Sequence, residues 1–306
     1  MDISVIIPTR NAGKYLNISL DLLNKQSIAV NEILVIDTES RDDTLEICKQ
    51  YSNINVIQVK QSEFNHGTTR NIAAKHSKGK YLIFLTQDAI PQNEKFIENL
   101  LKPFENSQVA AIYGRQIARN DATPMERFSR HFNYPEEDTT KSKKDLEVLG
   151  IKAFFFTNVC SAFRREDFDN IGGFQNDIIL NEDMIIASKL ILSGKLISYA
   201  STATVIHSHS YTFRQQFGRY FDIGVSLKMN RYILEYSKVE KEGNKFLIEA
   251  IKFFVKSLKL NCAVKIVIES IFKFAGFKLG LNYNLFSKSM VRDFSMHKNY
   301  WDRAQI

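Results

Sequence analysis

The chain contains few cysteines, and their spacing excludes two common kinds of framework. Only three of its 306 residues are cysteine, and they lie far apart at Cys48, Cys160 and Cys262. An odd number of distant cysteines provides neither a disulfide framework nor the close pairs that hold structural zinc. The three thiols therefore suit a reducing compartment, where we expect them to be small buried side chains.

Export signals and membrane-spanning runs are also missing from the sequence. The chain begins Met-Asp-Ile-Ser-Val and enters a strand pattern at once, without the basic and apolar regions of a signal peptide. Its longest apolar stretches, 246–258 and 264–277, are interrupted by Lys or Glu every three to five residues. Such stretches do not span a bilayer. We therefore expect a cytoplasmic protein that is either soluble or bound peripherally to the cytoplasmic face of the inner membrane.

Two glycine-rich nucleotide-binding motifs are absent as well. The first strand pattern is followed only by Gly13, so a G-x-G-x-x-G dinucleotide site is disfavoured, and no G-x-x-x-x-G-K-[ST] segment occurs anywhere. A pyrophosphorylase-type nucleotidyltransferase would need a glycine-rich loop at the same place. The composition, 44% hydrophobic and 25% charged, nevertheless indicates a well-buried folded domain with a smaller appendage.

Positive charge is concentrated at the C-terminal end. The net charge is +7, and residues 228–306 hold 15 basic against 7 acidic residues, so the remainder is close to neutral. This tail has no compact Arg-rich run or nucleic-acid motif, so an anionic membrane surface suits it better than nucleic acid. Its apolar periodicity predicts amphipathic helices, which either pack on the rest of the chain or lie in a membrane interface. A solvated helical face would also explain the charge.

Strand and helix patterns alternate through the first 90 residues. Strands are expected at 3–9, 32–37, 55–59 and 81–85. The helices between them are expected at 42–51, at 68–76 and, after a cap at Asn11, along a face formed by Leu16, Leu20 and Leu23. This alternation predicts an α/β fold with a mostly parallel sheet and helices on both faces. A ligand should then lie across the carboxyl ends of the strands.

Polar residues follow those strands where the ligand is expected. They are Thr9, Arg10 and Asn11 after the first strand, Asp37 and Glu39 after the second, and Gln87 and Asp88 after the fourth. Two further acids, Glu182 and Asp183, precede an apolar helix pattern at 184–192, and His207 and His209 follow at strand spacing. Acids before a helix also complement its dipole, so this placement alone does not establish a catalytic role.

Taken in order, these pieces resemble glycosyltransferase family 2, and more narrowly its bacterial rhamnosyltransferase branch. The resemblance rests on Pro-Thr-Arg-Asn from residue 8, Phe-Asn-His-Gly-Thr-Thr-Arg-Asn from 64, Thr-Gln-Asp-Ala-Ile-Pro from 86, Asn-Val-Cys-Ser-Ala-Phe-Arg-Arg from 158, Glu-Asp at 182 and His-Ser-His-Ser-Tyr-Thr from 207. It continues to Trp301. It implies a GT-A fold, a mixed and mostly parallel sheet flanked by helices, and inverting sugar transfer from a nucleoside diphosphate donor, which is dTDP-L-rhamnose in that branch. Acceptors are saccharides or lipid-linked oligosaccharides of surface polysaccharide.

The resemblance also implies a role for each residue. Asp88 and His207 would hold Mg²⁺ or Mn²⁺, Asp183 would be the general base, and Glu182 would support the acceptor side. The donor would be held by Thr9, Arg10, Asn11, Asp37, Glu39, His66, Arg70 and Gln87. An Asp with an ordinary pKa is ionised at neutral pH and accepts a proton as the new bond forms. The chain departs from the family where Thr86 replaces the first acid of D-x-D and Glu39 replaces a common glycine.

The expected organisation has two parts and one loop. Residues 1–227 form the catalytic domain, divided into a nucleotide-binding half (1–118) and an acceptor-binding half (119–227), and 228–306 form a basic helical region. The stretch 120–150 shows little apolar periodicity, so we expect a mobile loop there. Two other functions stay open: a family 2 transferase with a UDP-hexose donor, and a non-catalytic sugar-nucleotide-binding or membrane-scaffold protein.

Overall fold

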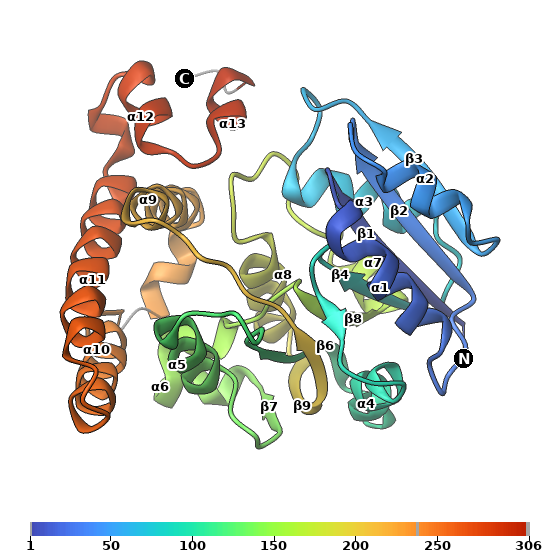
Figure 1. The fold of residues 1–306 in the computed structure, drawn as a ribbon, viewed down its shortest axis with the longest axis horizontal. Helices are drawn as coiled ribbons and strands as arrows, with labels where there is room; N and C mark the ends of the chain where they lie inside the picture. Colours follow the sequence, from blue (N-terminus) through green and yellow to red (C-terminus); the bar gives the residue numbers. More distant parts are fainter. Residues whose placement is uncertain (1, 237–238, 304–306) are drawn as a thin grey trace.

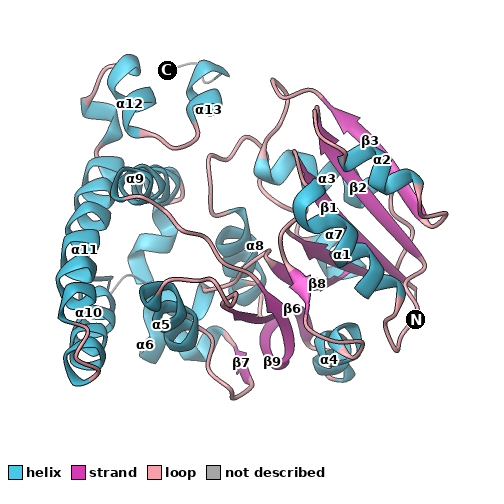
Figure 2. Cartoon of the chain, viewed as in Figure 1, coloured by secondary structure: helices cyan, strands magenta, loops and turns pink. Residues whose placement is uncertain are grey.

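The fold is built around one mixed sheet with a helical layer along one edge (Figures 1 and 2). The computed structural model describes residues 2–236 and 239–303, with side chains of 239–244 left undescribed. The strand order is β3-β2-β1-β4-β8-β6-β9-β5, and β7 pairs with β9. β1, β2, β3 and β4 run parallel, whereas β8 is antiparallel to both of its neighbours. The expected α/β sheet is therefore confirmed.

The strands have the following bounds: β1 Ile3–Thr9, β2 Glu32–Thr38, β3 Ile54–Val59, β4 Tyr81–Leu85, β5 Ile90–Pro91, β6 Val109–Ile117, β7 Thr139–Lys141, β8 Cys160–Arg164 and β9 Leu196–Ile206. Alternate side chains of β1 enter two separate cores. Ile3, Val5 and Ile7 face α1 and α4, while Ile6 joins the core against α3 and α8. Because both faces of the central strands are buried, their sequences read as continuous apolar runs.

The helices have the following bounds: α1 Gly13–Asn24, α2 Thr44–Lys49, α3 His66–His76, α4 Phe96–Leu101, α5 Pro124–Asn133, α6 Leu146–Leu149, α7 Arg165–Asn170, α8 Glu182–Leu192, α9 Phe213–Met229, α10 Val239–Lys256, α11 Leu260–Leu281, α12 Lys288–Phe294 and α13 Lys298–Arg303. Short 3-10 turns lie at Lys102–Glu105, Lys143–Asp145, Gly150–Phe154, Arg231–Tyr236 and Tyr283–Leu285. The predicted cap of α1 at Asn11 is wrong, because the capping position is Ala12 and Asn11 has a positive φ of 52°. Asn tolerates this left-handed conformation better than most residues.

The prediction of an unstructured loop over 120–150 is also wrong. α5 begins after Thr123, whose side chain accepts a hydrogen bond from Glu126 N, and Pro124 occupies its first turn. Thr followed by Pro is a strong helix-start signal. Phe128 packs against Ala250 and Phe254 of α10, so the apolar face of α5 is covered by the C-terminal helices. The partner of that face lies more than a hundred residues away, which is why local periodicity missed it.

α9 and α11 approach each other closely through glycine. A Cβ on Gly280 would lie 2.1 Å from the carbonyl oxygen of Phe221, and one on Gly276 would lie 2.3 Å from that of Phe217. Only glycine therefore permits this helix pair to pack. The predicted boundary after residue 227 falls in the last turn of α9, so it separates two helices, α9 and α11, that pack against each other. Among the described residues, no helix is long and apolar enough to cross a membrane.

Candidate active site

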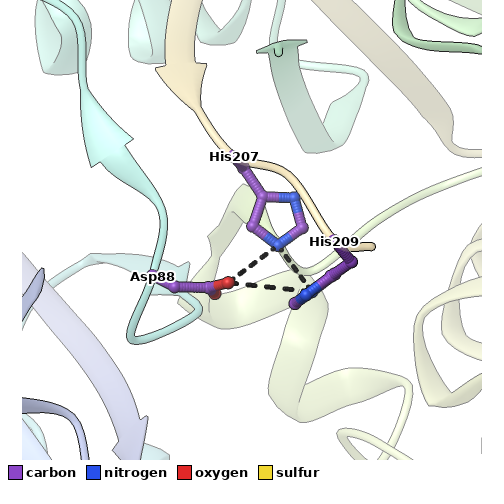
Figure 3. A group of neighbouring side chains, drawn as sticks. All are labelled: Asp88, His207 and His209. Atoms are coloured by element: carbon purple, nitrogen blue, oxygen red, sulfur yellow. Dashed lines mark hydrogen bonds and ion pairs between the residues drawn. The ribbon is translucent and has the colours of Figure 1, made fainter. Parts of the chain in front are cut away.

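Asp88, His207 and His209 converge at the carboxyl end of the sheet (Figure 3). The turn after β4 carries Asp88. The spacing of the two histidines predicted that they lie on a strand, but β9 ends at Ile206 and both histidines follow it. His207 Nε2 lies 3.4 Å and His209 Nε2 3.7 Å from Asp88 Oδ2, and the two Nε2 atoms lie 3.0 Å apart. One carboxylate oxygen and two imidazole nitrogens that face one another form a group able to hold a metal ion.

A chain of hydrogen bonds from α5 fixes the tautomer of His207. Arg130 donates from its guanidinium to Gln116 Oε1, so this atom of the amide must be the oxygen. The same oxygen lies 2.9 Å from His207 Nδ1, which must then carry the proton. The lone pair of His207 Nε2 is consequently directed at Asp88 and His209. Hydrogen bonding at the second ring nitrogen is the usual way in which proteins orient a ligating histidine.

The protonation states also suit a cation. Burial would raise the pKa of Asp88, but at the low pH where this acid titrates both histidines are protonated, and the hydrogen bond and charge of His207, with the charge of His209, lower the pKa to about 2. Burial lowers the pKa of His207, and burial with the neighbouring His207 lowers that of His209 to about 4. At neutral pH the group therefore has one negative charge and two neutral imidazoles, the forms in which these side chains bind metals.

A second acidic centre lies at the start of α8. Glu182 is buried and pairs with Arg70, with 3.3 Å between Oε1 and Nη1, and it accepts a hydrogen bond of 3.2 Å from Asn158 Nδ2. Asp183 is only partly buried, and its carboxylate accepts hydrogen bonds from the backbone N–H groups of Met184 and Asn158 at 2.8 and 3.3 Å. The two side chains therefore differ in exposure and in partners although they are adjacent in sequence.

The pKa values of these two acids are separated. Burial raises the pKa of Glu182, but the charges of Arg70 and His66 outweigh it, so the net shift is downward. Burial and the negative charge of Glu182 raise the pKa of Asp183 to about 7. The expectation of an ordinary pKa for Asp183 is therefore wrong. An acid with a pKa near neutrality is a stronger base than an ordinary carboxylate and still ionises at physiological pH.

The polar residues after β1 and β2 are tied to one another. Thr9 Oγ1 donates to Asp37 Oδ1 at 2.9 Å, and Ser40 donates to both Asp37 oxygens from its hydroxyl and its backbone N–H. Asp37 is fully buried. In the structure Thr9 and Asp37 thus hold the edge of the sheet together, and their contact with a donor stays a prediction.

Hydrogen bonds around Arg10 and Gln61 join the loops that follow β1, β2, β3 and β4. The backbone N–H of Arg10 donates to Gln87 Oε1 at 2.7 Å, which joins the β1 loop to the neighbour of Asp88. Its guanidinium donates to Gln61 Oε1 at 2.7 Å. Glu39, which replaces the common glycine, has a positive φ of 48° and accepts a hydrogen bond from Gln61 N at 2.8 Å. The glycine-like conformation is therefore retained, and the added carboxylate braces the next loop.

His66 and Arg70 connect this edge to the acidic pair. Asn65 caps α3, so the helix starts at His66 rather than at residue 68, and Arg70 donates to the His66 carbonyl at 2.9 Å. His66 packs edge-on against His297, with 4.9 Å between ring centroids. A pocket of about 350 Å³ opens here, lined by Arg10, Gln61, Phe64, Asn65, His66, Ile178, Ile179, Met296, His297, Lys298, Asn299, Tyr300 and Arg303. None of these residues is acidic, so the pocket favours an anionic ligand.

Several residues of the site were not found from the sequence as site residues. His209 completes the group around Asp88, and Gln116 and Arg130 orient His207 from β6 and α5. No local signal identifies Gln116, because its role depends on contacts across the fold. The histidine spacing of two residues was the signal for His209, since both rings reach Asp88 from the same loop.

Comparisons with known proteins show which family the sequence resembles. The profile of Glycosyl transferase family 2 matches residues 4–172. The chain is 39% identical to the O-antigen chain rhamnosyltransferase RfbN of Salmonella typhimurium, over all of this chain and 98% of that protein. It is 40% identical to the O-antigen chain rhamnosyltransferase WbaN of Salmonella anatum, over 99% and 96% of the two chains.

Solved structures show the same fold at low sequence identity. A mannosyltransferase from Pyrobaculum calidifontis, in complex with GDP-Man and Mn²⁺, superposes with a TM-score of 0.59 at 17% identity over 98% of this chain and 85% of that one. TarS of S. aureus, residues 1–349 in complex with UDP-GlcNAc, gives a TM-score of 0.55 at 16% identity over 92% of each chain. These likenesses confirm the expected GT-A type fold.

Proposed function

The chain belongs to glycosyltransferase family 2, and we propose that it transfers L-rhamnose from dTDP-L-rhamnose to a saccharide or lipid-linked acceptor of bacterial surface polysaccharide. One observation carries this assignment: the identity to two O-antigen rhamnosyltransferases extends over essentially the whole chain. The family profile ends at residue 172, whereas the sequence similarity to these two relatives continues through the C-terminal region.

Asp183 is the general base of the proposed reaction. Its partly exposed carboxylate takes the proton of the acceptor hydroxyl as that oxygen attacks the anomeric carbon, and the donor diphosphate leaves from the opposite face. This single displacement inverts the anomeric configuration. Glu182 stays ionised beside Arg70, and its charge keeps the pKa of Asp183 high enough for proton transfer.

Asp88, His207 and His209 are the residues that would hold the divalent cation of the donor complex. Such an ion neutralises charge on the departing diphosphate. The two imidazole nitrogens favour a first-row transition metal such as Mn²⁺ over Mg²⁺, which prefers an all-oxygen shell. Among the residues proposed to bind the donor, Arg10, Gln87 and Arg70 border this group or the acidic pair.

We place this reaction on the cytoplasmic face of the inner membrane, where a lipid-linked acceptor would be presented. The proposal requires only peripheral attachment to the membrane surface, which does not depend on a spanning helix.

The proposal is tested by donor turnover with purified protein. dTDP-L-rhamnose is compared with a panel of UDP- and GDP-sugars, each with Mn²⁺, with Mg²⁺ and with chelator, and released nucleotide is measured with and without a saccharide acceptor. We expect release of dTDP and of no other nucleotide, and only when metal is present. Asp88→Asn should abolish this release. The control Asp121→Asn changes an exposed acid outside the site and should keep it. Turnover of a UDP-sugar instead would retain the family and overturn the rhamnosyl assignment.

A further inference from the structure

The outer side of the C-terminal helical hairpin is unusually apolar for a surface. Of 19 large apolar side chains that are exposed in the described part of the chain, ten lie between residues 248 and 274. Phe253 also contacts the ring of Phe128 in α5, and Phe272 stacks on Phe213 in α9. We call the other eight side chains the hairpin face: Ile248, Val255, Leu258, Leu260, Val264, Ile268, Ile271 and Phe274. α10 and α11 run side by side along the edge of the molecule, away from the sheet (Figure 1).

The inner sides of the same helices are already used for packing. Phe254 and Ile266 are buried against α5, while Gly276 and Gly280 contact the backbone of α9. α11 is therefore apolar on both its inner and its outer side. Apolar surface that stays exposed over much of a helix is typical of a site that binds another molecule or a membrane.

Positive charge surrounds this face without being neutralised. Lys256, Lys259 and Lys265 are exposed, and within the described residues none has an acidic partner. The two acids of the segment are engaged by lysines of their own helices, Glu249 with Lys252 at 3.0 Å and Glu269 with Lys273 at 2.5 Å. Between residues 248 and 274, the charge beside the apolar side chains that has no partner of opposite sign in the described structure is thus positive.

The tip of the hairpin combines both features. Leu258 is 88% exposed and Leu260 60% exposed, and they alternate with Lys259 at the turn between α10 and α11. Leucines that project beyond a basic turn can enter the acyl region while the lysines remain at the headgroups. Two copies of this chain meeting through the same face would bring their lysines together, which costs energy that an anionic lipid surface would not impose.

We propose that the hairpin face docks the protein on an anionic bilayer, with Leu258 and Leu260 inserted and the three lysines at the headgroups. The face binds lipid from outside and does not require a spanning helix. The hairpin face would bring the proposed transferase to its membrane acceptor, and only this purpose rests on the proposed function. Lipid binding itself needs neither donor nor acceptor.

Vesicle co-sedimentation of the full chain tests the proposal without any substrate. Binding is measured to vesicles of equal parts phosphatidylcholine and phosphatidylglycerol, and to phosphatidylcholine alone. The variants are Leu258→Ser/Leu260→Ser and Lys256→Gln/Lys259→Gln/Lys265→Gln. Their matched controls are Val148→Ser, at an apolar side chain that is 81% exposed elsewhere, and Lys25→Gln/Lys75→Gln/Lys95→Gln on the catalytic domain. Thermal melting confirms that each variant folds.

We expect the native chain to prefer the anionic vesicles. Affinity for them should fall about fivefold for each lysine removed and at least about tenfold for the leucine pair. Both control variants should bind as the native chain does. Turnover with a water-soluble acceptor should be unaffected in the leucine variant. Equal binding by the leucine variant and the native chain would overturn the proposal. So would light scattering that shows a native dimer converted to monomer by the same variant, because the face would then belong to a second copy.

Discussion

The two acidic centres of this protein have opposite net pKa shifts, although burial acts on both in the same direction. Asp88 and Asp183 are both taken partly out of water, which by itself raises the pKa of each. Two histidines face Asp88, and they outweigh burial and lower its pKa to about 2, whereas burial and the negative charge of Glu182 together raise the pKa of Asp183 to about 7. The sign of the neighbouring charge decides whether the effect of burial is reversed, as at Asp88, or reinforced, as at Asp183.

This difference separates two chemical tasks. A permanently ionised carboxylate with neutral imidazoles attracts a cation, and a carboxylate poised near neutral pH moves a proton. Each centre also has its own support, Gln116 and Arg130 for His207, and Arg70 with Asn158 for Glu182. Substituting either acid, or a residue that orients or charges its surroundings, should therefore affect one task and leave the other intact.

The largest effect is expected from Asp88→Asn. Removing the only charge of the metal group should abolish tight Mn²⁺ binding and lower kcat by about 10³, because the ion supplies several kcal/mol of charge stabilisation. Electron paramagnetic resonance of Mn²⁺ titrations measures the binding, and Asp121→Asn is the control. Unchanged Mn²⁺ affinity would show that the ion is held elsewhere.

Asp183→Asn should lower kcat by about 10²–10³ through loss of the base. Mn²⁺ affinity should stay at the native value, because this centre is separate from the metal group. The combination of lost turnover and intact metal binding is the result that distinguishes the two centres. Equal loss of metal binding in this variant would mean that they act as one.

Arg130→Met should weaken Mn²⁺ binding about 10- to 100-fold, because the Gln116 amide loses one of the three contacts, with Arg130, Tyr134 and Thr157, that orient it toward His207. The control is Arg127→Met, on the same helix, where the guanidinium bonds only to backbone carbonyls in the described structure. Metal titration at several ion concentrations should also show that excess Mn²⁺ restores part of the activity. No recovery together with normal affinity would contradict a positioning role.

The smallest effect is a displaced pH profile in Glu182→Gln. In the native enzyme kcat should rise as pH increases through about 7, because protonated Asp183 cannot act as a base. Removing the charge of Glu182 lowers the pKa of Asp183, so this limb should move to lower pH by about one unit. A limb that stays in place or moves upward would show that Glu182 does not raise the pKa of Asp183.

The sequence predicted the parts of the fold that depend on local patterns. Ile3–Thr9 and Glu32–Thr38 are apolar runs that end in polar residues, so both the strands and the edge that carries Asp37 could be read directly. Asp88, Glu182 and His207 were found because their order matches a family. The GT-A fold followed from the same order.

The remaining features depend on distant contacts. α5 was missed because Phe128 packs on helices more than a hundred residues further along the chain, and Gln116 was missed because only the folded sheet brings it beside His207. The raised pKa of Asp183 could not be predicted either, since it depends on how deeply Glu182 and Arg70 are buried with it. The sequence therefore identifies Asp88 and Asp183 as candidate site residues, but their pKa values depend on the packing around them.

Direct titration of the carboxyl groups tests the account most closely. Carbon NMR of the protein with labelled aspartate, without metal or donor, would follow each carboxyl resonance across pH, with Asp88→Asn and Asp183→Asn providing the assignments. We predict that Asp183 titrates near pH 7 while Asp88 remains ionised throughout the range in which the protein is folded. Titration of Asp183 near pH 4, together with that of an ordinary aspartate, would contradict the proposed division between a proton-accepting and a cation-binding acid.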